Sequence, residues 1–284
     1  MRRALQTFSL VLCLALTVTA RAETPPDSAP RSGAPSIDNA LVLRLKPTVV
    51  NVERSCSIGL GGDHASLARA TGFVVDARRG LIATNRHVTG QSPAVYKIVF
   101  HNGQSTEARL RYYDPWHDFG FLQVDPRTLD FPLTEAPLGE STGLREQDDV
   151  LLIGNNEGNE YSVKFGKIAN LHLSKGDRHS ATLQTTFDRT KGTSGSPVFD
   201  PQGRVVALHF AGTDTTSFEL RAEYLRDALA QLQQDQTPRR GDAGLDLRLL
   251  LLSDAARHFH LPAELRRRVA ALRPGLKHVI AVDA

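Results

Sequence analysis

A short glycine- and serine-rich segment, Gly192-Thr193-Ser194-Gly195-Ser196-Pro197, holds the residue types that acyl-transfer chemistry requires. Flanking glycines let the backbone turn sharply and let neighbouring amides point toward a ligand. A nucleophilic hydroxyl needs such a turn, with N–H groups directed at the oxyanion that its attack creates. The same six residues are also typical of an ordinary hairpin turn, so the segment by itself leaves both interpretations open.

Two upstream segments favour the catalytic interpretation. His87 follows two short apolar runs that are typical of a hairpin, and Asp118 opens another apolar run after a turn marked by Pro115. The chain order His, Asp, Ser is that of the chymotrypsin-type triad and differs from the orders of subtilisins and α/β-hydrolases. The pattern predicts Ser194 as the nucleophile, His87 as its base and Asp118 as the group that orients the imidazole.

The serine loop also predicts an oxyanion hole and offers a rival nucleophile. We expect the backbone amides of Gly192 and Ser194 to form the hole, each contributing about 3 kcal/mol to the transition state. Ser196 is the second hydroxyl on the loop. Because a serine occupies position 196, the loop does not match the G-x-S-x-G elbow, and an esterase-like hydrolase on another fold is disfavoured.

Together the three motifs resemble the HtrA/Deg branch of the trypsin-like serine proteases. Members of that family have the motif T-N-x-H-V around the histidine and G-N-S-G-G-P around the serine. The forms H-D-F-G and G-T-S-G-S-P found here look most like the branch that contains fungal nuclear HtrA-like proteases. The resemblance covers residues 48 to 232 and continues more weakly to the C-terminus.

This resemblance implies an ATP-independent serine endopeptidase of protein quality control. Its partners would be unfolded or damaged proteins and peptides, it would use neither a metal nor an organic cofactor, and it would form a homo-oligomer, commonly a trimer. The alternative is a protease-fold chaperone or scaffold that binds misfolded chains with little turnover. The presence of His87, Asp118 and Ser194 favours the enzyme over the chaperone or scaffold, because a protein that only binds misfolded chains need not have a catalytic triad.

The resemblance also indicates where substrate would bind. His209, Phe210 and Ala211 would form the strand edge that pairs with an extended substrate, with the His209 side chain facing solvent or a pocket wall. Asp188 lies six residues before Ser194, where trypsin-like enzymes place the carboxylate that selects Arg or Lys. HtrA proteases instead cut after small aliphatic residues, with Asp188 here either exposed or neutralised by Arg189. Both specificities stay open at this point.

The distribution of short apolar runs predicts an all-β fold with two small barrels and a C-terminal helix. The resemblance implies that this is a chymotrypsin-like double β-barrel with an incomplete PDZ-like α+β tail. Helical spacing of leucines predicts that helix over residues 218–233. Strands are expected at residues 48–54, 72–76, 81–84, 94–101, 107–113, 119–124, 149–153, 161–173, 181–187, 197–200 and 205–210.

The domain boundaries follow composition. We expect a signal peptide at residues 1–22, a flexible leader at 23–40, the protease domain at 41–233, a linker at 234–244 and a partial PDZ-like segment at 245–284. The first segment has an arginine pair, a short apolar stretch and an A-x-A cleavage site, although an uncleaved anchor is an alternative. Cleavage predicts a periplasmic or secreted protein with no stable membrane insertion.

Charge and cysteine content exclude further classes of function. Arg2, Arg3 and Arg21 lie in the signal segment, which holds no acid, so its removal leaves the basic residues equal in number to the 31 acidic ones. Nothing therefore favours a nucleic-acid partner. Only Cys56 would remain, so no internal disulfide is expected, and a structural role is favoured over a reactive thiol. No metal site is expected, because His258 and His260 would point apart on a short helix.

Overall fold

The computed structural model describes residues 37–60, 63–156, 158–175, 180–188, 190–239, 246–258, 260–272 and 278–283. The chain divides into two compact units, of which Gly33–Arg239 is one and the C-terminal segment from residue 240 lies in the other. The predicted signal peptide and most of the predicted leader lie outside the described residues. Within the described part, no helix is long and apolar enough to cross a membrane.

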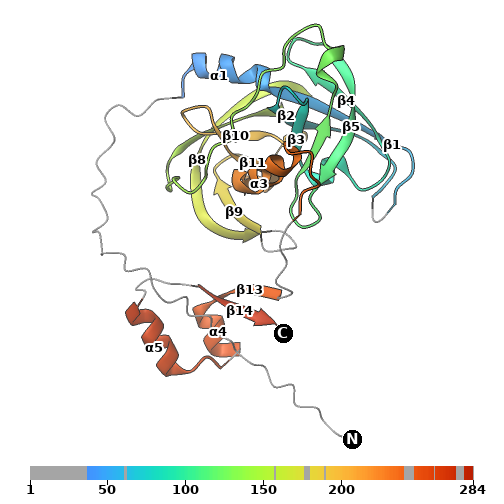
Figure 1. The fold of residues 1–284 in the computed structure, drawn as a ribbon. Helices are drawn as coiled ribbons and strands as arrows, with labels where there is room; N and C mark the ends of the chain where they lie inside the picture. The colour runs from blue at the N-terminus through green and yellow to red at the C-terminus, as the bar shows by residue number, and fades with distance from the viewer. Residues whose placement is uncertain are drawn as a thin grey trace, which may run out of the picture. The chain divides into compact units, whose positions relative to one another are not determined.

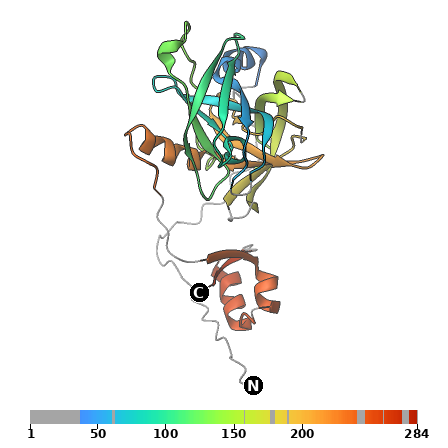
Figure 2. The same cartoon turned by 90° about the vertical axis from the view of Figure 1, so that its right-hand side faces the viewer.

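Two closed antiparallel barrels of six strands each make up the larger unit, and they lie side by side in Figures 1 and 2. The first has the strand order β1-β2-β3-β6-β5-β4 and the second β10-β11-β12-β9-β8-β7. The strands of the first barrel are β1 (Val49–Cys56), β2 (Ser66–Asp76), β3 (Leu81–Thr84), β4 (Val95–Phe100), β5 (Ser105–Tyr113) and β6 (Gly120–Gln123). Those of the second are β7 (Asp149–Asn156), β8 (Asn159–Lys175), β9 (Ser180–Thr185), β10 (Pro197–Phe199), β11 (Val205–Gly212) and β12 (Ser217–Arg221). The predicted double-barrel fold is confirmed.

Alternating side chains fill each barrel and also join the two. Along β7, Val150 and Leu152 lie in the interior cluster of the second barrel, whereas Leu151 and Ile153 lie in a larger cluster that includes residues of both barrels. This period of two is what an antiparallel strand with both faces buried produces. The shared cluster includes Phe73 and Phe121 from the first barrel, so the two barrels pack on a continuous apolar layer.

Short helical segments complete the larger unit. They are α1 (Asn39–Leu45), η1 (Lys46–Thr48), α2 (Arg86–Thr89), η2 (Pro126–Thr128) and α3 (Ala222–Leu232). Asp38 caps α1 by accepting a hydrogen bond from the backbone of Leu41 at 2.8 Å. Helix α1 starts at Asn39, two residues before the predicted domain boundary at residue 41, and buries Leu41 and Val42 in the shared cluster.

The predicted helix at residues 218–233 is wrong in its first part. Ser217–Arg221 forms β12, which pairs with β11 on one side and β9 on the other, and the helix α3 starts only at Ala222. The leucine spacing that indicated a helix includes Leu220, which the strand also buries. Closing the second barrel requires a sixth strand here, and that tertiary pairing overrides the local periodicity.

The C-terminal segment forms a small α+β unit of its own. Its elements are β13 (Asp246–Leu251), α4 (Leu252–His258), α5 (Ala263–Leu272) and β14 (His278–Asp283). The two strands pair antiparallel, α4 packs against both of them, and α5 packs against α4. These elements agree with the predicted α+β composition of the segment, while its PDZ-like identity stays a prediction.

Candidate active site

His87 and Asp118 meet at the ends of two neighbouring strands of the first barrel. β3 and β6 pair with Thr84 opposite Gly120, so the residues just beyond each end lie side by side. The Asp118 carboxylate binds His87 through both oxygens: Oδ1 accepts the His87 backbone N–H at 2.9 Å, and Oδ2 lies 2.6 Å from ring atom Nδ1. This double contact fixes the orientation of the imidazole and directs its Nε2 away from the carboxylate.

Local hydrogen bonds hold both residues of this pair in place. The side-chain amide of Asn85 donates to the backbone carbonyl of Asp118 at 2.9 Å. The buried carboxylate of Asp114 accepts the backbone N–H groups of Trp116 and His117 at 2.9 and 2.7 Å. The turn that Pro115 marks in the sequence is therefore fixed by Asp114. The His87 side chain remains 48% exposed, so it is accessible to a substrate.

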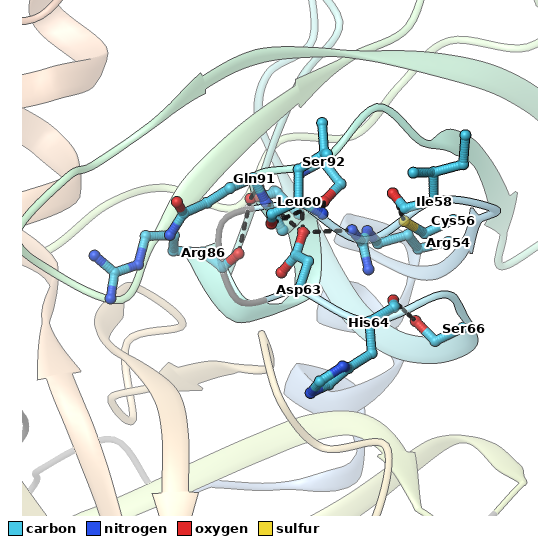
Figure 3. Close-up of polar contacts among 12 residues, drawn as sticks. Arg54, Cys56, Ile58, Leu60, Asp63, His64, Ser66, Arg86, Gln91 and Ser92 are labelled. Carbon is cyan, nitrogen blue, oxygen red and sulfur yellow. Dashed lines mark hydrogen bonds and ion pairs between the residues drawn. The ribbon is translucent and has the colours of Figure 1, made fainter.

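The C-terminal end of the helix that carries His87 is fixed by a second carboxylate, Asp63 (Figure 3). Its Oδ2 accepts the backbone N–H groups of Gln91 and Ser92 at 2.7 and 2.9 Å and a hydrogen bond from Arg54 at 2.8 Å. Burial by itself would raise the pKa of Asp63, but the hydrogen bonds from Ser92 and Gln91 and the charge of Arg54 outweigh it, so the pKa lies below its usual range. No sequence motif indicated this network.

Gly90 ends the same helix and only a glycine fits there. Its φ is +65°, and an added Cβ would lie 2.2 Å from Nη2 of Arg54 and 2.6 Å from Oδ2 of Asp63. Nearby, the buried Cys56 contacts the backbone oxygen of Ile58 at 3.3 Å. That contact agrees with the structural role expected of this cysteine.

The serine loop is fastened to the first barrel by Thr71 of β2. The backbone N–H of Thr71 donates to the carbonyl of Ser194 at 2.9 Å, and its hydroxyl donates to the carbonyl of Gly192 at 2.9 Å. The carbonyl of Thr71 in turn accepts the hydroxyl of Thr84, which precedes the histidine segment, at 2.7 Å. Thr71 therefore links the loop of the candidate nucleophile to the strand that positions His87.

Asn155 and the glycines of the serine loop also hold this loop against the first barrel. The Asn155 backbone N–H donates to the Thr71 hydroxyl at 2.9 Å, and its side-chain amide donates to the carbonyl of Ala70 at 2.8 Å. Gly195 has φ +85°, and a Cβ there would lie 2.0 Å from the Thr71 carbonyl oxygen. No other residue fits so close an approach of two backbones. Thr71 and Asn155 are functional candidates that the sequence analysis missed.

The amides of the serine loop divide into two groups. The N–H of Gly195 donates to the carbonyl of His209 and that of Ser196 to the carbonyl of Thr193, both at 3.0 Å. For the N–H groups of Gly192 and Ser194 no acceptor is found among the described residues. Gly192 has φ +93°, in the region that favours glycine. These two amides are the ones predicted to form an oxyanion hole.

Ser194 and His87 are not joined by a hydrogen bond among the contacts of the described residues, whereas His87 and Asp118 are. Contacts between nucleophile and base are often long before substrate binds. The other hydroxyl, Ser196, is fully buried, and its Oγ has no hydrogen-bond partner in the described part of the chain. A buried hydroxyl cannot reach a polypeptide substrate, which disfavours Ser196 as the nucleophile.

Asp188 does not lie in a buried pocket. Its side chain is 63% exposed and pairs with Lys164, whose Nζ lies 2.9 Å from Oδ1. The Lys164 hydrogen bond holds the pKa of the Asp188 carboxyl below its usual range. Exposure was one of the two outcomes expected for Asp188; the proposed partner Arg189 lies outside the described residues. This position gives no support to selection of Arg or Lys.

The predicted substrate strand is part of β11. β10 pairs with β11 only as far as Leu208, and the serine loop pairs with His209, while β12 borders the other side. Phe210 and Ala211 are partly buried and lie beyond the segment that β10 covers. The His209 side chain does not face solvent, which was one of the two expected arrangements: the residue is 3% exposed, and its Nδ1 lies 3.0 Å from Oε2 of the fully buried Glu219. A position on a pocket wall, the other arrangement, stays a prediction.

Comparison with known proteins shows which proteins the chain is similar to. The trypsin-like peptidase domain matches residues 70–208. The pro-apoptotic serine protease NMA111 of Lodderomyces elongisporus is 34% identical over 227 residues, which cover 76% of this chain and 23% of that protein. NMA111 of Saccharomyces cerevisiae is 32% identical over 254 residues, which cover 84% and 25%. The chain thus spans about a quarter of the length of these curated relatives.

Solved structures support the same fold. The HtrA-type protease AlgW with tripeptide has a TM-score of 0.64 at 24% identity, over 76% of this chain and 70% of that one. Deg5 has a TM-score of 0.58 at 23% identity, over 70% of this chain and 95% of that one. At these identities the likeness concerns the fold alone. With the relatives above, it confirms the predicted resemblance to HtrA-type trypsin-like serine proteases.

The predicted periplasmic or secreted location is wrong. The curated relatives found are pro-apoptotic serine proteases of yeasts, not periplasmic or secreted proteins. The prediction rested on the arginine pair, the short apolar stretch and the A-x-A site of residues 1–22, which lie outside the described residues. A composition signal in one terminal segment is weaker evidence than similarity that extends over most of the chain.

Proposed function

We propose that this chain, which is similar to the trypsin-like serine proteases and to their HtrA-type members, is an endopeptidase that hydrolyses unfolded polypeptides with a His87-Asp118-Ser194 triad. The observation that carries the proposal is the double contact between the Asp118 carboxylate and His87. An imidazole held in this way has its Nδ1–H directed at the carboxylate, which leaves Nε2 as the acceptor for the serine proton.

In the proposed reaction, Ser194 Oγ attacks the scissile carbonyl carbon while His87 Nε2 takes the hydroxyl proton. The tetrahedral oxyanion is stabilised by the backbone N–H groups of Gly192 and Ser194, for which no acceptor is found in the described part of the chain. His87 then donates its proton to the leaving amine, and water hydrolyses the acyl-enzyme by the same steps.

The substrate backbone would bind as an additional strand. Phe210 and Ala211 continue β11 beyond the segment that pairs with β10, so their outer edge is available to an extended peptide. An extended segment in a folded protein usually has its backbone N–H and C=O groups paired within a sheet, whereas those of an unfolded chain are free, which supports unfolded polypeptides as the substrate class. Assembly into a homo-oligomer remains a proposal that rests on the family alone.

A second candidate function is a chaperone or scaffold with the protease fold. It is favoured by one observation, that no hydrogen bond joins Ser194 to His87 among the described contacts. Such a protein would bind unfolded chains at the same strand edge and release them uncut.

Digestion of an unfolded protein such as casein separates the two functions. The full chain should fragment casein, and Ser194→Ala should abolish this while leaving the fold intact. Ser196→Ala is the matched control: its buried Oγ has no partner among the described residues, so removing it should preserve most of the activity. If the full chain binds casein without cutting it, or if Ser194→Ala still cuts, the proposed protease function is wrong.

A further inference from the structure

The second barrel encloses a polar cluster that the proposed triad does not use. His209 is 3% exposed and Glu219 is fully buried, and the two side chains meet at 3.0 Å. The other oxygen of Glu219 accepts the hydroxyl of Thr185 at 2.8 Å. Charged side chains are seldom buried this deeply, and a buried ion pair is weak as a stabilising device. A functional explanation for the cluster is therefore warranted.

The cluster lies directly beside the candidate nucleophile. The N–H of Gly195 donates to the carbonyl of His209 at 3.0 Å, and the N–H of His209 donates to the carbonyl of Ser196 at 2.9 Å. His209 is thus paired through its backbone with the two residues that follow Ser194. Its neighbour Leu208 packs in the layer shared by the two barrels, whereas Ala207 packs in the interior of the second barrel.

Strand alternation places the His209 side chain on the interior side with Ala207, and cross-strand pairing places Glu219 opposite it. Glu219 also pairs with Leu183 of β9, whose side chain belongs to the interior cluster together with Phe187. The polar cluster therefore lies in the interior of the barrel, at the end nearest the serine loop. A side chain of the residue whose carbonyl Ser194 attacks would enter the protein at this end.

The hydrogen bonds of the cluster determine what the imidazole can offer such a side chain. Glu219 accepts from the Thr185 hydroxyl and from Nδ1–H of His209. Within the described residues no partner is found for Nε2 of His209, and this atom is not among the buried polar atoms left without one. Nε2 is therefore the ring atom that can form a hydrogen bond with an incoming group.

A carboxamide side chain fits this atom, because it carries both an N–H donor and a carbonyl acceptor. An aliphatic side chain would leave Nε2 unpaired away from water, which is strongly unfavourable. Glu219 already places a carboxyl group in the cluster, so a neutral carboxamide is favoured over a second carboxylate. Asp188 does not compete for a basic side chain, because it is exposed and bound to Lys164. Glutamine has a carboxamide and a chain long enough to reach a buried partner.

We propose that His209, oriented by Glu219 and Thr185, determines specificity by selecting glutamine at the residue whose peptide bond is cleaved. This inference rests on the proposed protease function and differs from the small aliphatic preference that the family resemblance implies. Two measurements test it, one that requires turnover and one that does not.

The first measurement compares kcat/KM for two peptides that differ only by glutamine or methionine before the scissile bond. The two side chains have similar length, and only glutamine carries a carboxamide that can form a hydrogen bond with Nε2. The full chain should prefer glutamine ~100-fold or more, since a site built to hydrogen-bond a polar group discriminates strongly against an analogue that lacks it. His209→Leu should bring the ratio close to one, whereas a purely structural role would lower both rates equally. Equal rates for the two peptides in the unmodified chain overturn the proposal.

Asp188→Ala serves as the matched control, because it removes the exposed carboxylate that sequence reasoning assigned to the pocket. The ratio of the two rates should not change. If Asp188→Ala abolishes the preference, or if peptides with Lys or Arg before the bond are cut fastest, the assignment to His209 is wrong.

The second measurement uses the full chain carrying Ser194→Ala and an intact His209, so it does not depend on turnover or on the folding of a His209 variant. Product peptides that end in glutamine or methionine are titrated by calorimetry. The glutamine peptide should bind at least ~10-fold tighter. Equal affinities contradict the proposed pocket. Preferential binding of glutamine by a chain that never cuts casein would support the pocket while showing that the proposed protease function is wrong.

Discussion

The two barrels each hold a histidine against a carboxylate, and the two pairs have opposite surroundings. In the first barrel His87 is 48% exposed and the Asp118 carboxylate binds both its ring and its backbone. In the second barrel His209 and Glu219 are almost completely buried. A histidine paired with a carboxylate is thus accessible to solvent in the first barrel and enclosed in the second. An accessible pair can exchange protons with a substrate, whereas an enclosed pair can only present a fixed hydrogen-bonding atom.

Replacing each carboxylate by its carboxamide gives the most direct test of this contrast. In Asp118→Asn, the Asn oxygen can still accept the His87 backbone N–H, but its amide would face Nδ1 and impose the tautomer whose Nε2 bears a hydrogen. That nitrogen cannot accept the serine proton, so kcat should fall by ~10⁴. Casein hydrolysis checks this, and thermal unfolding should show little change, because exposed ion pairs contribute at most about 1 kcal/mol.

The corresponding change at the enclosed pair, Glu219→Gln, should have the opposite effect: it should lower the stability of the fold more than the rate of casein hydrolysis. The Gln oxygen can still accept from Thr185, but its amide would face Nδ1 of His209, and the hydrogen bond from Nδ1–H to the carboxylate would be lost. We expect a loss of about 2 kcal/mol in the free energy of unfolding, as for other buried hydrogen bonds to charged groups. Urea denaturation measures the loss. If the two carboxamide variants lose rate and stability to the same degree, the contrast between the two pairs is incorrect.

The smallest expected effect concerns Asp63, which fixes the end of the His87 helix (Figure 3). Since the pKa of Asp63 is lowered in the folded state, its stabilising contribution is present above the unfolded value of about 3.9 and is lost as the pH falls through the folded value. Asp63→Asn should therefore cost about 1 kcal/mol near neutral pH and progressively less below about pH 4. Urea denaturation at several pH values measures this difference.

Asp188→Asn is the control for that series. Its carboxyl also has a lowered pKa, but the side chain is 63% exposed, so the substitution should leave unfolding nearly unchanged at every pH. A constant difference between the unmodified chain and Asp63→Asn across the acid range would show that the charge of Asp63 does not matter.

Sequence reasoning succeeded where the signal is local. The apolar runs around His87 and Asp118 and the glycines around Ser194 are short-range patterns, and they predicted the strands and the order of the motifs. Thr71 could not be found in this way, because its bond to the Gly192 carbonyl joins residues 121 positions apart. Glu219 was assigned to a helix because Leu220 fits a helical spacing, although the need to close the barrel makes the segment a strand.

The central claim is that Ser194 is the nucleophile and that the His87-Asp118 pair activates it. Labelling of the full chain with a fluorophosphonate, followed by mass spectrometry of its peptides, tests this without any assumption about substrate. The account predicts modification of Ser194 at a rate that Ser196→Ala preserves and that His87→Ala lowers by several orders of magnitude. Modification of Ser196 instead, or an unchanged labelling rate in His87→Ala, would contradict it.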